Sequence, residues 1–277
     1  MKLKGVLLIL AVWILISCHK ESDNPPPAPV NPNSFVALKL KDISRGIFPS
    51  PYYHFEYRDD KYIAVFNFSN GLNYDMTYNG DNLTLMKNNT EGTTKDSIKY
   101  HYTGHQLTHI IVTTGNGTTY RRAFLSYYNS GQLKELEWEL LVDNGVFARE
   151  QSFSFSYYPD GNVKEIVQDY FAIGQLPATS FTDRYENYDH KKNADGFTLV
   201  EPSRFNVPIL VPGITLQMNN PGRVVRSGGA TPTFEANYNY TYDANDRPLV
   251  KIGDFVHTSG PDAGQHYQLQ TTFSYYN

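Results

Sequence analysis

The chain has 277 residues, and 28 Asp and Glu against 24 Lys and Arg give it a formal net charge of −4. This balance excludes the strongly basic surface that is typical of a nucleic-acid-binding protein. Tyr supplies 22 residues, charged residues make up only 19 % of the chain, and the Ala-, Leu-, Glu- and Lys-rich patterns of long helices are missing. Because Tyr, Thr, Phe and Val favour half-buried strands, the composition predicts an almost all-β protein.

Residues 1–17 have the pattern of a secretory signal peptide, in which two lysines precede an apolar run. The run is about eleven residues long, whereas a membrane-spanning helix needs about twenty. Leu15-Ile16-Ser17-Cys18 resembles the bacterial lipobox, which implies that Cys18 becomes the diacylated first residue of the mature chain. Cys18 is the only cysteine, so no disulfide competes for it. The alternative is an ordinary signal peptide that happens to contain a cysteine.

Residues 18–34 are expected to carry the lipidated cysteine and a tether. Lys20, Glu21 and Asp23 resemble the acidic export tag that directs Bacteroidetes lipoproteins to the outer face of the outer membrane, although a solvated tether has the same composition. Five prolines follow before residue 35 and favour an extended, semi-rigid spacer. We therefore expect a lipid anchor in the outer membrane that faces the cell exterior, with a periplasmic orientation as the open alternative.

Residues 35–277 carry an internal repeat and are expected to form one β-repeat domain. In each copy, apolar and polar residues alternate up to a Tyr, and a polar turn and two apolar residues three positions apart follow. This pattern predicts a β-hairpin with one apolar face, which is stable only when neighbouring hairpins cover it. We expect an antiparallel meander that forms a coiled or partly closed sheet. The copies contain Tyr57, Tyr78, Tyr102, Tyr127, Tyr157, Tyr242 and Tyr275, and the apolar pairs are Tyr62/Val65, Leu83/Met86, Leu107/Ile110, Leu133/Leu136, Val163/Ile166 and Leu249/Ile252.

The hairpin unit resembles the YD-type repeats of the Rhs family. As a whole, the region resembles the uncharacterised repeat lipoproteins of Bacteroidetes, since Tyr188-Asp189-His190-Lys191-Lys192-Asn193 is close to their Tyr-Asp-x-Lys-x-Asn-Pro signature. Ala194 stands where that signature has Pro. The resemblance implies a fold and a location, and it carries no activity. A transmembrane barrel is not expected, because Ser, Thr and Asn dominate the outer faces of the repeats.

Residues 168–237 interrupt the repeat with six prolines and several glycines, which predicts a loop-rich insertion. An insertion of this length is either functional or a cover over a sheet edge. Tyr170, Phe181, Tyr185 and Tyr188 are the candidates for an exposed ligand-binding platform, and core packing is the alternative for each.

No motif for enzyme chemistry is present, so we expect neither catalytic residues nor a cofactor nor a bound metal. His101, His105 and His109 are four residues apart, but they fall within one predicted hairpin and fit exposed polar positions better than a metal site. A glycoside hydrolase is the less favoured alternative, because it needs two facing carboxylates. The carboxylates near the insertion are those of Asp183, Glu186, Asp189 and Asp195.

Asp96-Ser97-Ile98 resembles the Asp-Ser/Thr-aliphatic site that Bacteroidetes O-glycosylate after export, which makes Ser97 a candidate for modification. Taken together, these features predict a lipid-anchored surface protein that contacts the membrane through its anchor and binds a glycan or a partner protein. A structural envelope protein is the alternative.

Overall fold

The computed structural model describes residues 38–277 except 59–61, 70, 93–94, 143–144, 195–198, 201–208 and 230–232. The predicted signal peptide, Cys18 and the tether lie outside the described residues. The described strands are β1 (Leu40–Arg45), β2 (Tyr53–Arg58), β3 (Tyr62–Phe68), β4 (Asn73–Asn79), β5 (Asn82–Asn88), β6 (Ser97–Thr103), β7 (Gln106–Thr113), β8 (Thr119–Tyr127), β9 (Leu133–Leu141), β10 (Phe147–Tyr157), β11 (Val163–Tyr170), β12 (Thr179–Tyr188), β13 (Leu199–Val200), β14 (Ile209–Leu210), β15 (Pro221–Gly228), β16 (Phe234–Tyr242), β17 (Pro248–His257) and β18 (His266–Tyr275).

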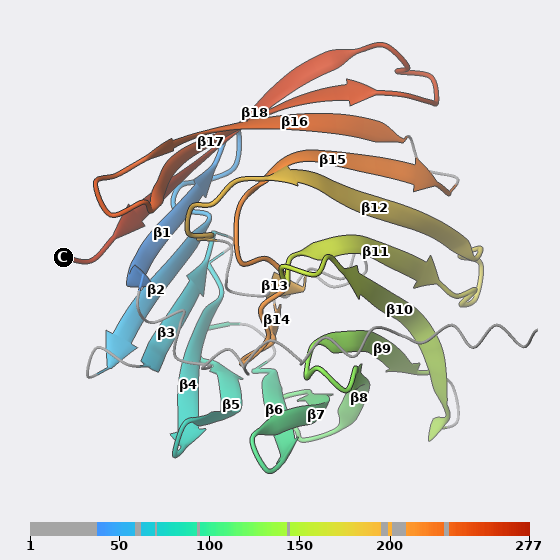
Figure 1. Ribbon diagram of the computed structural model, residues 1–277. Helices are drawn as coiled ribbons and strands as arrows, with labels where there is room; N and C mark the ends of the chain where they lie inside the picture. Colours follow the sequence, from blue (N-terminus) through green and yellow to red (C-terminus); the bar gives the residue numbers. More distant parts are fainter. Residues whose placement is uncertain are drawn as a thin grey trace, which may run out of the picture.

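Sixteen of these strands form one closed antiparallel barrel, which Figure 1 shows as a ring. Each barrel strand pairs with the barrel strands before and after it in the chain, and β1 closes the ring by pairing with both β2 and β18. Ile43 of β1 therefore lies opposite Tyr53 on one side and Phe273 on the other. The predicted antiparallel meander of hairpins is confirmed, whereas the prediction of a coiled or partly closed sheet is wrong because the last strand returns to the first.

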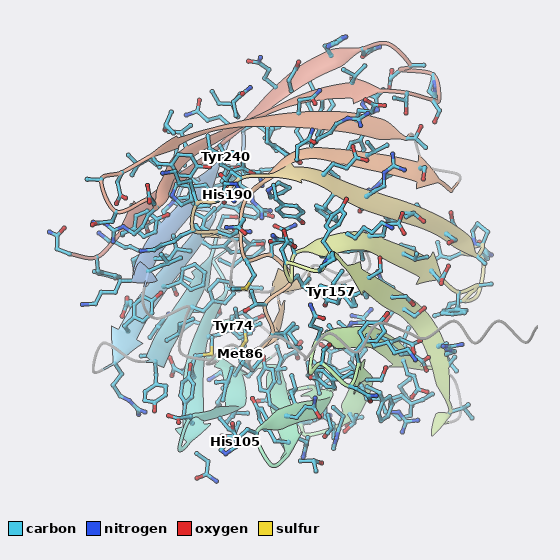
Figure 2. All side chains as sticks on the ribbon, in the orientation of Figure 1. Tyr74, Met86, His105, Tyr157, His190 and Tyr240 are labelled. Carbon is cyan, nitrogen blue, oxygen red and sulfur yellow. The ribbon has the colours of Figure 1, made fainter. Side chains whose placement is uncertain are left out.

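The apolar face of the sheet lies inside the ring. In β6, Ile98 and Tyr100 are buried while Lys99 between them is exposed, as the two-residue period of a strand requires. Figure 2 shows Tyr74 and Met86 within the ring, and it shows His105 at the edge of the molecule. These buried side chains belong to one core cluster that extends from β1 to β11 and includes β18.

The segment between β12 and β15 enters the barrel. Ala194, Leu210, Val211 and Ile214 belong to the same core cluster as the wall, and Figure 1 shows β13 and β14 in the middle of the ring. The end of β11, all of β12 and β15, and the start of β16 lie within residues 168–237 and continue the wall. The insertion predicted for 168–237 therefore reduces to residues 189–220, whose described core residues fill the interior rather than cover a sheet edge.

Four of the six predicted apolar pairs face the core, and the first and last are wrong by one residue. Ile63 and Phe66 are buried in place of the predicted Tyr62 and Val65. In β17, near the C-terminal end of the sequence, the predicted Leu249 and Ile252 are exposed. Because successive side chains of a strand point to opposite faces, a shift of one residue at the turn moves the whole set to the other face.

The repeated tyrosines tie neighbouring strands together at one rim of the barrel. Each of seven hydroxyls donates a hydrogen bond to a backbone carbonyl near the start of the adjacent strand, over distances of 2.6 to 3.1 Å. We call these bonds the tyrosine latches and this end of the barrel the latch rim. The donor and acceptor pairs are Tyr57 and Leu40, Tyr102 and Leu83, Tyr127 and Leu107, Tyr157 and Leu133, Tyr188 and Val163, Tyr240 and Pro221, and Tyr275 and Pro248.

A β-bulge accompanies most of these latches. The strand register shifts between Ser126 and Tyr127, and again between Ser156 and Tyr157, because the following strand carries an extra residue, Lys134 or Lys164, opposite the step into the latch tyrosine. The same shift occurs at Tyr57, Tyr78 and Tyr102. A bulge bends its strand and increases the local twist. Recurrent bulges at one rim therefore supply curvature where the sheet must close on itself.

Candidate ligand site on the inner wall

A continuous row of stacked side chains lines the inner wall from β11 to β18, near the rim opposite the latches, which we call the far rim. The row, which we call the aromatic arc, consists of Tyr170, Phe181, Arg226, Phe234, Phe255 and Tyr267.

Ring contacts link the members of the arc in strand order. Tyr170 stacks on Phe181 with ring centroids 5.7 Å apart, and the Arg226 guanidinium lies 4.1 Å from the Phe181 centroid. The same guanidinium is 4.9 Å from the ring of Phe234, which therefore shares it with Phe181. At the β18 end, Phe255 stacks almost parallel on Tyr267 at 4.9 Å. The β11 end is buried, whereas Tyr267 is 44 % exposed, so the arc opens toward solvent at β18.

Strand register explains why these side chains share the inner face. Phe255 lies opposite Ala236 on one side and Tyr267 on the other, and Ala236 is fully buried. Gly253 has no side chain, which leaves space for the rings of Phe255, in the arc, and of the neighbouring Tyr238. A Cβ at this position would lie 2.6 Å from the Phe255 ring and 2.7 Å from the Tyr238 ring, so only glycine lets both rings lie across β17.

A partly buried ion pair holds the cation of the arc in place. The Arg226 guanidinium donates to both carboxylate oxygens of Asp183 at 2.6 Å, and Gln168 donates to the same carboxylate at 2.9 Å. Burial lowers the pKa of Arg226, but the hydrogen bond and the charge of Asp183 outweigh this effect, so the pKa is raised above its ordinary value. Arg226 is therefore held in one place as a cation between two aromatic rings.

Two polar side chains beside the buried end of the arc are incompletely hydrogen-bonded. Gln151 is fully buried, and within the described residues neither its amide nitrogen nor its amide oxygen has a hydrogen-bond partner. Glu150 is also buried: one carboxylate oxygen accepts from Arg121 at 3.0 Å, and the other has no partner among the described residues. In the strand register, Gln151 lies opposite Trp138 on one side and Tyr170 on the other. Buried polar groups are nearly always satisfied, so these atoms point to a missing hydrogen-bonding partner.

The four predicted ligand-binding aromatics all face the barrel interior. Tyr170 and Phe181 form the buried end of the arc, so they are not part of an exposed platform. Tyr185 packs against the core, and Tyr188 forms a latch to Val163 at 2.7 Å, where burial raises the pKa of its phenol. The structure thus brings two of the four together, and their role in ligand binding remains a prediction.

The carboxylates considered for hydrolysis do not converge. Asp183 faces inward to Arg226, whereas Glu186 faces outward and contacts Arg184 at 2.7 Å and Arg223 at 2.6 Å. Asp189 lies at the latch rim, where the Asn220 amide donates to it, and Asp195 lies outside the described residues. The described members of this group lie on different faces or at different ends of the barrel, which is not the arrangement of a glycosidase pair.

The remaining predicted positions lie on the outer wall or outside the described residues. His101 and His109 are paired across β6 and β7 with ring centroids 4.2 Å apart, and His105 lies in the turn between them. No group of three or more potential metal ligands occurs in the described part of the chain. Ser97 begins β6 beside the buried Ile98 and faces outward, and its glycosylation remains a prediction.

Sequence patterns did not identify several residues of the inner wall, which include Gln151, Arg226, Phe255 and Tyr267. A sequence signal was available for one of them. Gln151 continues the apolar alternation of Phe153 and Phe155, so it is a polar residue in line with a core face. A polar side chain at such a position needs an interior partner.

The outer wall is charged. Arg122 pairs with Glu139, and Arg149 with Glu137, across neighbouring strands. Arg223 bridges to Glu186 and to Glu235, which adds a further cross-strand ladder. An Arg or Lys side chain on a lipid-facing barrel surface costs about 2–4 kcal/mol at the bilayer midplane, and an Asp or Glu side chain costs less. Each of β1 to β7 is six to eight residues long, shorter than the roughly 9–11 residues of a membrane-spanning strand.

Within the described residues, no helix has the length and apolar character to cross a bilayer.

Comparisons with known proteins identify the fold. No protein-family model matches the chain, and no curated protein matches its sequence. Among solved structures, a porin-like protein from Bacteroides uniformis superposes with a TM-score of 0.57 at 10 % identity, covering 87 % of this chain and 97 % of that one. A porin-like protein from Bacteroides vulgatus gives a TM-score of 0.56 at 12 % identity, with 86 % and 99 % covered.

The likeness to these two structures shows that the expected resemblance to YD/Rhs-type repeat lipoproteins is wrong. The chain has the closed sixteen-strand architecture of the porin-like proteins, and it is not an open YD/Rhs-type hairpin-repeat lipoprotein. The repeated Tyr that suggested YD repeats is instead the donor of the tyrosine latches, whose function is to join the strands of a closed barrel.

Proposed function

We propose that this chain is a lipid-anchored protein of the outer membrane whose barrel stands in water beside the bilayer and binds a ligand. The charged outer wall is the observation that carries the proposal, because ladders such as Arg149 with Glu137 are stable in water and costly in lipid. The likeness to porin-like proteins of Bacteroides supports an outer-membrane location. Cys18 supplies the attachment that the wall itself lacks, because two or more acyl chains hold a protein stably on a membrane.

The position of the first described residues orients the barrel relative to this anchor. The Leu38 carbonyl accepts a hydrogen bond from Arg247, and the Lys39 carbonyl accepts one from the backbone of Tyr276. These contacts lie beside the tyrosine latches, so the tether joins the barrel at the latch rim. The far rim, where the aromatic arc opens, is the end remote from the membrane. If the Lys20, Glu21 and Asp23 tag places the anchor on the outer face of the outer membrane, the far rim faces the cell exterior.

Lipid attachment is tested by labelling and fractionation. Cells that express the chain are grown with radiolabelled palmitate, and a parallel variant has residues 1–18 replaced by a signal peptide that lacks a lipobox cysteine. We expect label only on the native chain, and we expect the replaced variant in the soluble fraction. If the variant remains in membranes after a carbonate wash, the barrel wall itself is inserted and the proposal is wrong.

A further inference from the structure

We infer that the far rim carries a contact surface for a second copy of this chain, formed by the free edge of β18 at residues 266–270. The contact joins two copies through backbone hydrogen bonds between their β18 strands. It goes beyond the proposed function and does not depend on the lipid anchor.

The first half of β18 has a neighbouring strand on one side only. On the β17 side, pairing continues to the first residue of the strand, His266. On the β1 side, the register ends where Arg45 meets Thr271, and the Gly46 N–H adds one hydrogen bond to the Gln270 carbonyl at 2.7 Å. Within the described residues, no strand pairs with this side of β18 before residue 270. Figure 1 shows the β17–β18 hairpin reaching past the end of β1 at the top of the ring.

The backbone groups of this edge point to solvent. In an antiparallel ladder, the N–H and C=O of one residue point to the same side, and the side alternates along the strand. The Gln270 carbonyl points to the β1 side, so the backbone groups of Gln268 and His266 point there too. Four of the five residues from 266 to 270 are exposed. The edge therefore offers two donors and two acceptors to another strand.

This edge lacks the features that normally prevent strands from pairing. Natural edge strands are protected by Lys and other charged residues, by Pro, by bulges or by a covering loop. Residues 266–270 read His-Tyr-Gln-Leu-Gln, without Lys, Arg, Asp, Glu or Pro, and the β17–β18 register has no shift. The neighbouring β1–β2 turn adds apolar surface, since Ile47 is 93 % exposed and Phe48 is 46 % exposed. An uncharged edge of this kind favours pairing with another strand.

A second copy of β18 fits this edge because the edge is self-complementary. When two such strands run antiparallel about a two-fold axis at Tyr267, His266 of each copy lies opposite Gln268 of the other. These two residue pairs exchange four hydrogen bonds, which use all the edge-facing backbone groups of both residues. No like charges meet, because the edge has no charged side chains. The ladder ends before Gln270, whose carbonyl already accepts from Gly46, so β1 keeps its place.

The exposed aromatic residue of the edge lies on the axis. Tyr267 is 44 % exposed and stacks on Phe255 with ring centroids 4.9 Å apart. In the pair, Tyr267 faces the same residue of the second copy at a non-hydrogen-bonded position, where side chains of opposite strands are closest. Aromatic cross-strand pairs of this kind stabilise a sheet. The stacked rings of the arc therefore continue from one copy into the other.

Antiparallel pairing joins the two barrels far rim to far rim. Their N-terminal segments leave at opposite ends of the pair, because Leu38 lies at the latch rim, where its carbonyl accepts from Arg247. The contact is small compared with the roughly 1,600 Å² of a standard stable interface. We therefore expect single and paired copies to exchange, and a covalent trap is the suitable way to detect the pair.

Disulfide trapping tests the pairing on the full-length chain, purified in a mild detergent. Tyr267→Cys places two thiols at the axis, where the Cα atoms of a non-hydrogen-bonded pair are about 4.5 Å apart, within the range that a disulfide spans. Phe124→Cys is the matched control, because Phe124 is 43 % exposed but lies on the outer wall. The native chain reports any contribution of Cys18, its only cysteine.

Under mild oxidation, we expect Tyr267→Cys to form a covalent dimer at least about tenfold faster than Phe124→Cys, because pairing raises the effective concentration of the two thiols. Equal rates for the two variants would overturn the inference. The edge would then be open to an extended segment of another protein.

A further substitution tests whether backbone pairing is the cause. Gln268→Pro removes the N–H that points to the second copy. In a single copy that N–H faces solvent, so the melting temperature should be unchanged. Added to Tyr267→Cys, the substitution should reduce the rate of dimer formation to that of Phe124→Cys. If the Pro variant is less stable, Gln268→Lys takes its place, because it keeps the N–H and adds a charge to the edge.

A rate of dimer formation that neither substitution at Gln268 lowers would also overturn the inference, since the thiols would then meet without strand pairing. Palmitate labelling of residue 18 is independent of these rates, so the two proposals can fail separately.

Discussion

Replacing one latch tyrosine tests whether the repeated Tyr holds the barrel together. In Tyr127→Phe the ring stays in place and only the hydroxyl is lost. That hydroxyl donates to the Leu107 carbonyl at 2.6 Å, from a site where burial raises the pKa of the phenol. A typical hydrogen bond contributes about 0.5–1.5 kcal/mol, and leaving a buried acceptor without a donor costs about 1–3 kcal/mol. We therefore expect Tyr127→Phe to lower the free energy of unfolding by about 2 kcal/mol.

The assay is thermal unfolding followed by circular dichroism. For a domain of this size, each kcal/mol shifts the melting temperature by about 2–4 °C, so the expected decrease is about 4–8 °C. Tyr62→Phe is the matched control, because the Tyr62 hydroxyl also donates a hydrogen bond, to Asp81, but at an exposed position. Water replaces that partner, and we expect a change within about 0.5 kcal/mol. Equal effects of the two variants would refute the reasoning, since the latch would then contribute no more than a surface hydrogen bond.

Three further predictions concern the charge, the packing and the titration of the interior. Asp183→Ala leaves the partly buried Arg226 guanidinium without its carboxylate and should destabilise the barrel by about 1.5–3 kcal/mol, whereas Lys191→Ala, which breaks an exposed ion pair, should cost under about 1 kcal/mol in the same urea titration. Gly253→Ala should cost about 1–3 kcal/mol, because its Cβ would overlap the Phe255 ring; a melting temperature equal to that of the native chain would show that the rings rearrange freely. Burial raises the pKa of the latch tyrosines above their ordinary value of 10, so their contribution to stability is complete below pH 10 and is lost as pH rises toward the folded-state values. The free energy of unfolding should therefore fall above pH 10, and less steeply in Tyr127→Phe than in the native chain; identical pH profiles would contradict this.

The hairpins could be predicted because each is a local feature. In the copy around Tyr127, alternation, an Asn-Ser-Gly turn and the apolar pair Leu133 and Leu136 all lie within about fifteen residues, and all point to the same hairpin. Closure could not be predicted in the same way. It depends on β1 reaching β18, where Ile43 meets Phe273 across almost the whole chain, and no local pattern specifies that contact.

The candidate site was recovered only in part, for a related reason. Tyr170 and Phe181 were selected as aromatics in an unusual segment, and the structure places both in the arc. Their partners Phe255 and Tyr267 belong to strands far along the chain that become neighbours only in the closed barrel. Alternation shows that these residues face the interior, but it does not show which interior residues meet. For Tyr170 and Phe181, core packing, the alternative to an exposed platform, is what the structure shows, because the insertion is shorter than residues 168–237 and both residues belong to wall strands.

The central claim is that the barrel lies outside the bilayer and is held there by its N-terminal anchor. It is tested most directly by placing a specific protease site within the proline-rich segment 24–34 and treating washed outer membranes with the protease in the absence of detergent. We expect the folded barrel to be released into the soluble fraction, because its outer wall carries ion-pair ladders such as Arg223 with Glu186 and Glu235. A barrel that stays in the membrane after complete cleavage would contradict the account and would show that the wall is embedded in lipid.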